Sequence, residues 1–210
     1  MQLTAAIIVI GFVGGFVHHN NTAHREVQLA ADLRRDYPTG VDVQIFENHS
    51  GVAAHREILR SLDIDRDGAL SSDEKGKARI VLYGHSWGAS EVVHTARTLE
   101  KEGIPVLLTI QVDSVSKPGE DDKHIPANVS EAVNFFQRDG LLRGQSKILA
   151  TDPARTRILG NFQSDYRSKS VNCAGFPWYA QLFMKPHIEI ESDPSVWNRI
   201  ESLIRLQLPR

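Results

Sequence analysis

One stretch of the chain decides the fold prediction, and it reads Ile80-Val81-Leu82-Tyr83-Gly84-His85-Ser86-Trp87-Gly88-Ala89. An apolar run suited to a buried strand leads into a G-x-S-x-G motif, and an amphipathic helical pattern follows. Small residues two positions before and after a serine permit a tight strand-to-helix turn with a strained serine backbone. Such a turn lifts the Ser86 hydroxyl above the sheet edge, at a helix N-terminus that favours negative charge. The stretch therefore predicts a nucleophilic serine.

Strand-like and helical stretches alternate along the chain. The expected strands are Ala5–Phe12, Val41–Phe46, Ala78–Tyr83, Val106–Val112 and Arg157–Phe162. The expected helices are Thr22–Asp36, Val52–Leu62, Ser86–Glu102, Ser130–Arg138 and Pro194–Gln207, the last with Asp193 as its N-cap. This alternation predicts an α/β fold, with a mostly parallel open sheet and helices on both faces. Because no repeat or Pro/Ser-rich linker interrupts it, we expect residues 1–210 to form a single domain without a separate cap domain.

The composition is that of an ordinary globular domain, with 41% hydrophobic and 24% charged residues among 210. A formal net charge of -2 provides no electrostatic footprint for nucleic acid or for an anionic membrane. The apolar stretch Thr4–Val17 is too short to span a bilayer and has no preceding basic residue, so we interpret it as the first core strand. The single Cys173 cannot form an intrachain disulfide, so a cytoplasmic and a secreted location both stay open.

The tight strand-to-helix turn at Ser86, called the elbow from here on, resembles the nucleophile elbow of the α/β-hydrolase superfamily. The strand–helix order also resembles that of the superfamily, over nearly the whole chain. The resemblance implies a serine hydrolase acting on a carboxylic ester or thioester, with a triad in the chain order serine, acid, histidine. Ser86 is then the nucleophile. Asp113 is the expected acid, because it ends the strand after the elbow, as in thioesterase-like members, and parallel strands end at one sheet edge. Asp165 and Asp152 are the alternatives.

The resemblance also implies a late histidine as general base. His187 stands just before the final helix, where superfamily members keep this residue, and His124 is the other late candidate. The base would take the proton of Ser86 while the acid fixes its tautomer. We therefore expect His187 to be the base.

An oxyanion hole should supply two backbone donors. The first is the N–H of Trp87, directly after the nucleophile. The second should come from the glycine-containing loop after the first strand, which resembles the oxyanion loop of the superfamily; Phe12 is the expected donor and Val13 the next choice. His18 and His19 follow this loop, but without a matched partner we expect them to be exposed side chains and not metal ligands.

A second motif has the pattern of an EF-hand calcium loop at residues 63–74. Oxygen donors occupy its positions 1, 3 and 5, a glycine follows at position 6, and a glutamate ends it at position 12. The expected ligands are Asp63, Asp65, Asp67, the carbonyl of Ala69, Ser71 and Glu74. Because the loop precedes the elbow strand, it should lie at the end of the sheet opposite Ser86, so we expect a structural calcium ion. No organic cofactor is expected.

The substrate side is less defined. Residues 173–183 are rich in aromatic side chains and precede His187, which suits either an apolar acyl pocket or ordinary packing under a loop. The expected partner is a small-molecule ester. A catalytically inactive calcium-binding or scaffold protein on the same fold is the alternative, and acyl transfer would use the same residues.

Overall fold

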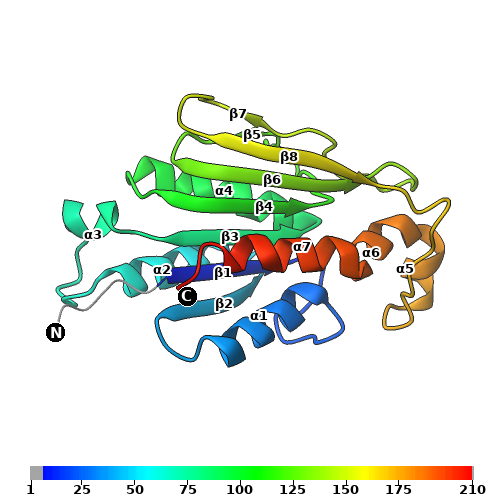
Figure 1. The fold of residues 1–210 in the computed structure, drawn as a ribbon, viewed down its shortest axis with the longest axis horizontal. Coiled ribbons are helices and arrows are strands. Elements are labelled where there is room, and N and C mark those ends of the chain that lie inside the picture. The colour runs from blue at the N-terminus through cyan, green and yellow to red at the C-terminus, as the bar shows by residue number, and fades with distance from the viewer. Residues whose placement is uncertain (1–6, 210) are drawn as a thin grey trace.

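The computed structural model describes residues 7–209, and Figure 1 shows them as a sheet between two layers of helices. The sheet has six strands in the order β2-β1-β3-β4-β6-β8, and every neighbouring pair is parallel. The strands are β1 (Ile7–Val13), β2 (Val41–Glu47), β3 (Ile80–His85), β4 (Val106–Val112), β6 (Val129–Gln137) and β8 (Arg157–Ser164). A small sheet pairs β5 (His124–Ile125) with β7 (Leu149–Ala150). Ala5 and Ala6, at the start of the first predicted strand, lie outside the described residues.

Helices cover both faces, which confirms the predicted fold class. Buried side chains of α1 (Arg25–Asp36) and α7 (Pro194–Arg205) share one core cluster. Those of α2 (Gly51–Leu62) and α4 (Trp87–Lys101) share the other. The remaining helices are short: α3 (Ser72–Gly76), α5 (Trp178–Phe183) and α6 (Lys185–Ser192).

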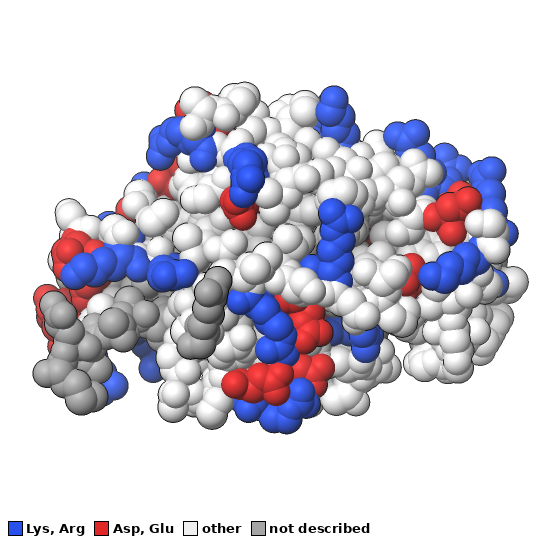
Figure 2. Space-filling view, in the orientation of Figure 1, with Lys and Arg blue, Asp and Glu red and all other residues white. Residues whose placement is uncertain are grey.

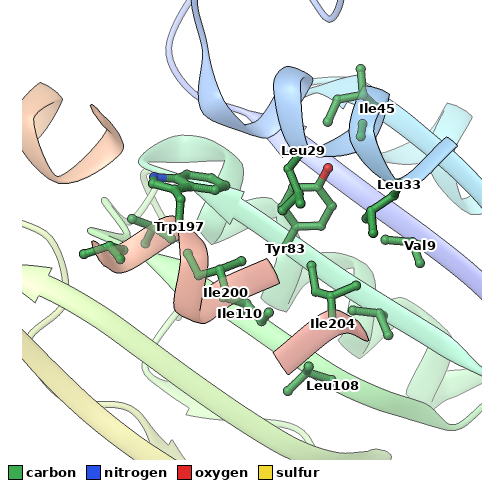
Figure 3. Close-up of a cluster of buried hydrophobic side chains, with 14 of the residues drawn as sticks. Val9, Leu29, Leu33, Ile45, Tyr83, Leu108, Ile110, Trp197, Ile200 and Ile204 are labelled. Atoms are coloured by element: carbon green, nitrogen blue, oxygen red, sulfur yellow. The ribbon is translucent and has the colours of Figure 1, made fainter. Parts of the chain in front are cut away.

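Alternation along the strands divides the core into these two layers. In β1, Ile7 and Val9 belong to the layer under α1 and α7, whereas Ile8 and Ile10 belong to the layer under α2 and α4. Figure 3 shows Trp197, Ile200 and Ile204 of α7 gathered over strand residues of the first layer. Each fully buried side chain of this size stabilises the fold by roughly 1.5–3 kcal/mol. Because side chains are buried on both of its faces, the sheet is held rigidly between the helix layers, and so are the residues at the carboxyl ends of its strands.

The predicted helix Ser130–Arg138 is wrong, because this segment forms strand β6 in the sheet interior. Val129, Ala132, Val133 and Phe136 are spaced like the apolar stripe of a helix. However, β6 is paired on both sides and buried on both faces, so apolar residues occupy both faces and the period-2 signal is lost. Pairing with β4 and β8 therefore decided the conformation.

The strand order places a switch point between β1 and β3. From β1 the chain moves outward to β2, then crosses back to β3 and continues outward on the other side. In open α/β sheets the carboxyl ends of the strands at such a point leave a crevice for a ligand. Ser86 follows β3 and Gly14 follows β1, so both residues stand at this crevice.

The surface has no strongly charged tract on the face shown in Figure 2, where acidic and basic side chains are interspersed. Among the described residues, no helix has both the length and the apolar character needed to cross a membrane.

Candidate active site

The turn after β3 has the geometry expected of the elbow. Ser86 has φ 57° and ψ −125°, a backbone conformation that L-residues rarely adopt. A Cβ on Gly84 would lie 2.6 Å from the carbonyl carbon of Gly88, and a Cβ on Gly88 would overlap the carbonyl oxygen of Phe12. The two glycines are therefore required because backbone passes directly beside them, which keeps Ser86 in its strained position.

Three predicted side chains meet at this turn. The Ser86 hydroxyl donates to Nε2 of His187 at 2.8 Å, and Nδ1–H of His187 donates to Oδ2 of Asp113 at 2.7 Å. This assignment of protons follows because an ionised carboxylate can only accept. Ser86, His187 and Asp113 are 8%, 3% and 0% exposed, so little water competes for these bonds. The arrangement can move a proton from the hydroxyl to the imidazole.

The carboxylate of Asp113 is held by two residues that the sequence analysis did not identify. Oδ1 accepts the backbone N–H of Gln137 at 3.2 Å and that of Gly144 at 3.0 Å, and Oδ2 accepts the side-chain amide of Gln137 at 2.8 Å. A Cβ on Gly144 would overlap the backbone of Asp113. Since Gln137 lies at the end of the mispredicted strand β6, no local signal pointed to it.

The alternative acids and the alternative histidine lie elsewhere. Asp165 is exposed and accepts the backbone N–H of Arg167 at 2.9 Å, which helps to lower its pKa. Asp152 accepts the N–H of Ala154 at 3.0 Å. His124 pairs with Asp121 at 2.8 Å on the surface. None of these three side chains takes part in the hydrogen-bonded chain described above.

A second histidine supports the first. The rings of His85 and His187 are 4.5 Å apart between centroids, and His85 bonds the carbonyl of His187 through Nε2 at 3.1 Å. Nδ1 of His85 lies 3.1 Å from a carboxylate oxygen of Glu191, one turn further along α6. Burial opposes the charged form of His85, but the Glu191 carboxylate outweighs it and raises the pKa. A protonated His85 can donate both bonds.

The pKa of His187 shifts in the opposite direction to that of His85. Burial and the charge of the neighbouring His85 lower the pKa of His187, although the Asp113 carboxylate opposes them. His187 is therefore neutral at neutral pH, which is the form that can accept a proton. Its helix, α6, is buried along residues 187–191, so the position of the ring is fixed by packing.

The expected oxyanion donors flank the elbow. Trp87 is the first residue of α4, so its N–H belongs to the unpaired first turn of a 15-residue helix. Phe12 lies inside β1, paired with β2 on one side and β3 on the other. In the loop after β1 the backbone of Gly14 approaches Ser86, since an added Cβ there would be 2.9 Å from the Ser86 Cβ. The exposed ring of Phe16 contacts that of Trp87 edge-on, at 5.6 Å between centroids.

The predicted calcium loop folds back on itself. Gly68 has φ 85°, and Asp63 accepts the N–H groups of Asp67 at 3.2 Å and Gly68 at 3.1 Å. Glu74 reaches back across the loop and accepts the N–H of Ile64 at 2.8 Å. As a result Asp63, Asp65 and Glu74 each place one carboxylate oxygen within 4.8 Å of the others.

The loop lies away from the candidate active site. It follows α2 and leads through α3 to the start of β3, whereas Ser86 follows the end of β3. In Figure 1, α3 and α5 stand at opposite ends of the molecule. The predicted ligand Asp67 is outside this group of carboxylates and accepts the N–H of Ala69 at 2.8 Å. Ser71 caps α3, where it and Glu74 form a capping box.

Comparison with known proteins finds weak similarity of fold. No protein family model and no curated protein matches the chain. A YdeN-like hydrolase from Pectobacterium atrosepticum is 14% identical, with 97% of this chain and 94% of that chain covered and a TM-score of 0.44. An esterase/lipase from an uncultured bacterium is 13% identical, with 97% and 77% covered and a TM-score of 0.46. A cutinase-like protein from Cryptococcus sp. is 11% identical, with 96% and 94% covered and a TM-score of 0.46.

Proposed function

We propose that this protein is a serine hydrolase that cleaves a carboxylic ester or thioester through an acyl-enzyme on Ser86. The observation that carries the proposal is the continuous hydrogen-bonded chain from Ser86 through His187 to Asp113. It joins a strained serine, a neutral buried imidazole and a fully buried carboxylate at the switch point of a parallel sheet. Those are the parts that nucleophilic acyl transfer requires.

The reaction begins when Oγ of Ser86 attacks the substrate carbonyl carbon and Nε2 of His187 takes the hydroxyl proton. Asp113 stabilises the imidazolium and holds its tautomer. The carbonyl oxygen becomes an oxyanion, for which the Trp87 N–H is one donor. Phe12 stays the predicted second donor. The backbone of Gly14, two residues later, also approaches Ser86.

The second half of the reaction reverses these roles. The carbonyl re-forms as the bond to the alcohol or thiol breaks, and His187 donates its proton to that leaving group. Water then attacks the acyl-enzyme, His187 takes a proton from it, and the acid leaves as Ser86 recovers its hydrogen. An acyl acceptor other than water would make the same site a transferase.

Exposed apolar side chains favour an apolar acyl group as substrate. Phe16 is 97% exposed beside Trp87, and on α5 Leu182 and Phe183 are 66% and 63% exposed. Helix α5 leads directly into α6, which carries His187. Part of the aromatic segment packs instead, since Phe176 and Met184 lie against Cys173 and Ile188.

Labelling with a fluorophosphonate probe tests the proposal. The probe should attach to Ser86 alone, as mass spectrometry of the digested protein would show, and prior denaturation should abolish labelling. Labelling at another residue, or none in the folded protein, would favour the inactive scaffold.

We also propose that residues 63–74 bind a structural calcium ion. The twelve-position pattern and the approach of Glu74 to Asp63 and Asp65 support it. The ion would clamp the connection from α2 to β3 and relieve repulsion among the carboxylates. Because the loop lies far from Ser86, the ion takes no part in the reaction.

A further inference from the structure

A second cluster of titratable side chains is buried behind His187. It joins His24, at the N-cap of α1, and Glu26, in the first turn of that helix, to Glu191 on α6. Their exposures are 8%, 0% and 2%. One nitrogen of the imidazole and one oxygen of each carboxylate lie within 4.8 Å of one another. None of these three groups touches the reacting atoms in the mechanism proposed above, and only Glu191 has been described so far, as the partner of His85.

Glu26 is the unexplained member of this cluster. Both of its carboxylate oxygens are buried, and no donor among the described residues bonds them; the group they face is the carboxyl of Glu191. Its neighbour Glu191 is also an acid, so burial and then the charge of Glu191 raise the pKa of Glu26. Two carboxyl groups that face each other in the interior must share either a proton or a cation, because two unpaired carboxylates there would be costly.

We propose that His24, Glu26 and Glu191 bind a divalent transition-metal cation, for which zinc is the best match. One imidazole nitrogen and two carboxylate oxygens form a three-ligand set of the kind that holds zinc with a fourth position open. An imidazole ligand favours zinc over calcium or magnesium. A tetrahedral zinc ion with bonds of about 2.0–2.1 Å needs ligand atoms roughly 3.3 Å apart. The ligand atoms of the cluster lie within 4.8 Å of one another, and the closest pair is 2.5 Å apart, so the side chains would move to reach this distance when the ion binds.

The surroundings of the three groups are those of a supported metal site. His85 lies 3.1 Å from the second oxygen of Glu191 and can orient that carboxylate from outside. Phe176 places its ring edge-on to His24, with 5.1 Å between centroids, and so shields one side of the imidazole. Nδ1 of His24 lies 2.5 Å from Oε1 of Glu191, so the two atoms share a hydrogen bond whose proton the ion would replace.

An ion at this position would tie α1 to the helix that carries His187. Glu191 lies one helical turn after His187 on α6, whereas Glu26 belongs to α1 and His24 is the N-cap of that helix. The proposal stands apart from the proposed hydrolase function, since it needs only binding and not turnover.

Zinc titration of the metal-free protein tests this inference. The protein is dialysed against EDTA and then against buffer, and zinc binding is measured by calorimetry. Wild type and Ser86→Ala should each bind one equivalent at this site and gain melting temperature. Glu26→Gln should lose that equivalent, because its affinity for zinc at this site should fall strongly. The fall should exceed the ~10- to 100-fold typical of changes to residues that only support the metal ligands.

A matched control addresses the other histidine–carboxylate group. His18, His19 and Glu47 also approach one another, but on the surface. Glu47→Gln should therefore retain the equivalent that Glu26→Gln loses. Glu26→Gln replaces a buried carboxyl that faces the Glu191 carboxylate with a neutral amide of similar size, so without zinc it should melt no lower than wild type. Absence of tight binding in wild type, its persistence in Glu26→Gln, or its loss in Glu47→Gln would overturn the proposal.

Discussion

His187 Nε2 lies 2.8 Å from the hydroxyl oxygen of Ser86, although 101 residues separate them in the chain. The end of β3 presents the hydroxyl and the start of α6 presents the imidazole. Both partners are buried, so the contact depends on how α6 packs against the sheet edge.

Ser86→Ala should leave the fold intact and reduce hydrolysis of a short p-nitrophenyl ester by several orders of magnitude. Only the oxyanion hole and binding would still contribute to the rate. The measurement is kcat/KM beside a circular dichroism spectrum. A folded variant that keeps more than about a tenth of the activity would contradict the role of Ser86, because triad losses are far larger than tenfold.

Asp113→Asn should be severely impaired, by about 10⁴-fold in kcat if it follows the aspartate-to-asparagine change of other serine triads, because His187 would be held in the wrong tautomer. Asp165→Asn is the matched control, since Asp165 is exposed and bonded to Arg167. Kinetics of both variants with the same ester separate the two acids. If Asp165→Asn were the slower enzyme, the assignment of Asp113 would be wrong.

The rate should depend on pH through His187. Its pKa is lowered in the folded protein, so kcat/KM should rise through an apparent pKa below the ordinary 6.5 and level off toward neutrality. His85→Gln removes a neighbouring positive charge and should move this acid limb to higher pH. His94→Gln, an exposed change on α4, should leave the limb in place. If the acid limb of the kcat/KM profile stayed at the same pH in His85→Gln, the charge of His85 would not influence the pKa of His187.

Gly144→Ala should lower kcat/KM strongly while the protein stays folded at the assay temperature. The added methyl group would overlap the backbone of Asp113, so the carboxylate must shift away from His187. A misplaced catalytic group can cost about 100-fold in rate. At Gly76, by contrast, an added Cβ meets nothing within 4 Å, so Gly76→Ala is the control. Equal activity of the two variants would show that Gly144 does not position the acid.

Removal of calcium should lower the melting temperature without abolishing activity. A ligand at a hundredfold excess over its Kd stabilises the folded state by about 2.7 kcal/mol, roughly 5–10 °C for a domain of this size. EGTA should therefore lower the Tm by that amount, and Glu74→Gln should remove the response to added calcium. Asp73→Asn, a neighbouring change paired with Lys77, should keep the response.

Two outcomes would contradict this prediction in different ways. If EGTA abolished turnover without a change in melting, the ion would belong to the active site. If it changed neither, residues 63–74 would be an acidic loop that binds no calcium.

The sequence by itself predicted most of the elements and the tight turn that carries Ser86. Gly84, Ser86 and Gly88 prescribe a tight turn wherever a buried strand meets a helix, because the steric requirement is local. The alternation of apolar strands and amphipathic helices likewise predicts a parallel sheet with helices on both faces, as the structure has it. Local periodicity was misleading at β6, where burial on both faces removes the alternation that distinguishes a strand.

Only the tertiary structure decided which distant side chains meet. The bonds from Gln137 and Gly144 to Asp113, and the cluster of His24, Glu26 and Glu191, join segments that are separate in sequence; His24 and Glu191 are 167 residues apart. Spacing along a chain says nothing about such pairs, because their distance is set by how α1, α6 and the strand ends pack together. A polar residue gains its partner, or lacks one, only when that packing removes it from water.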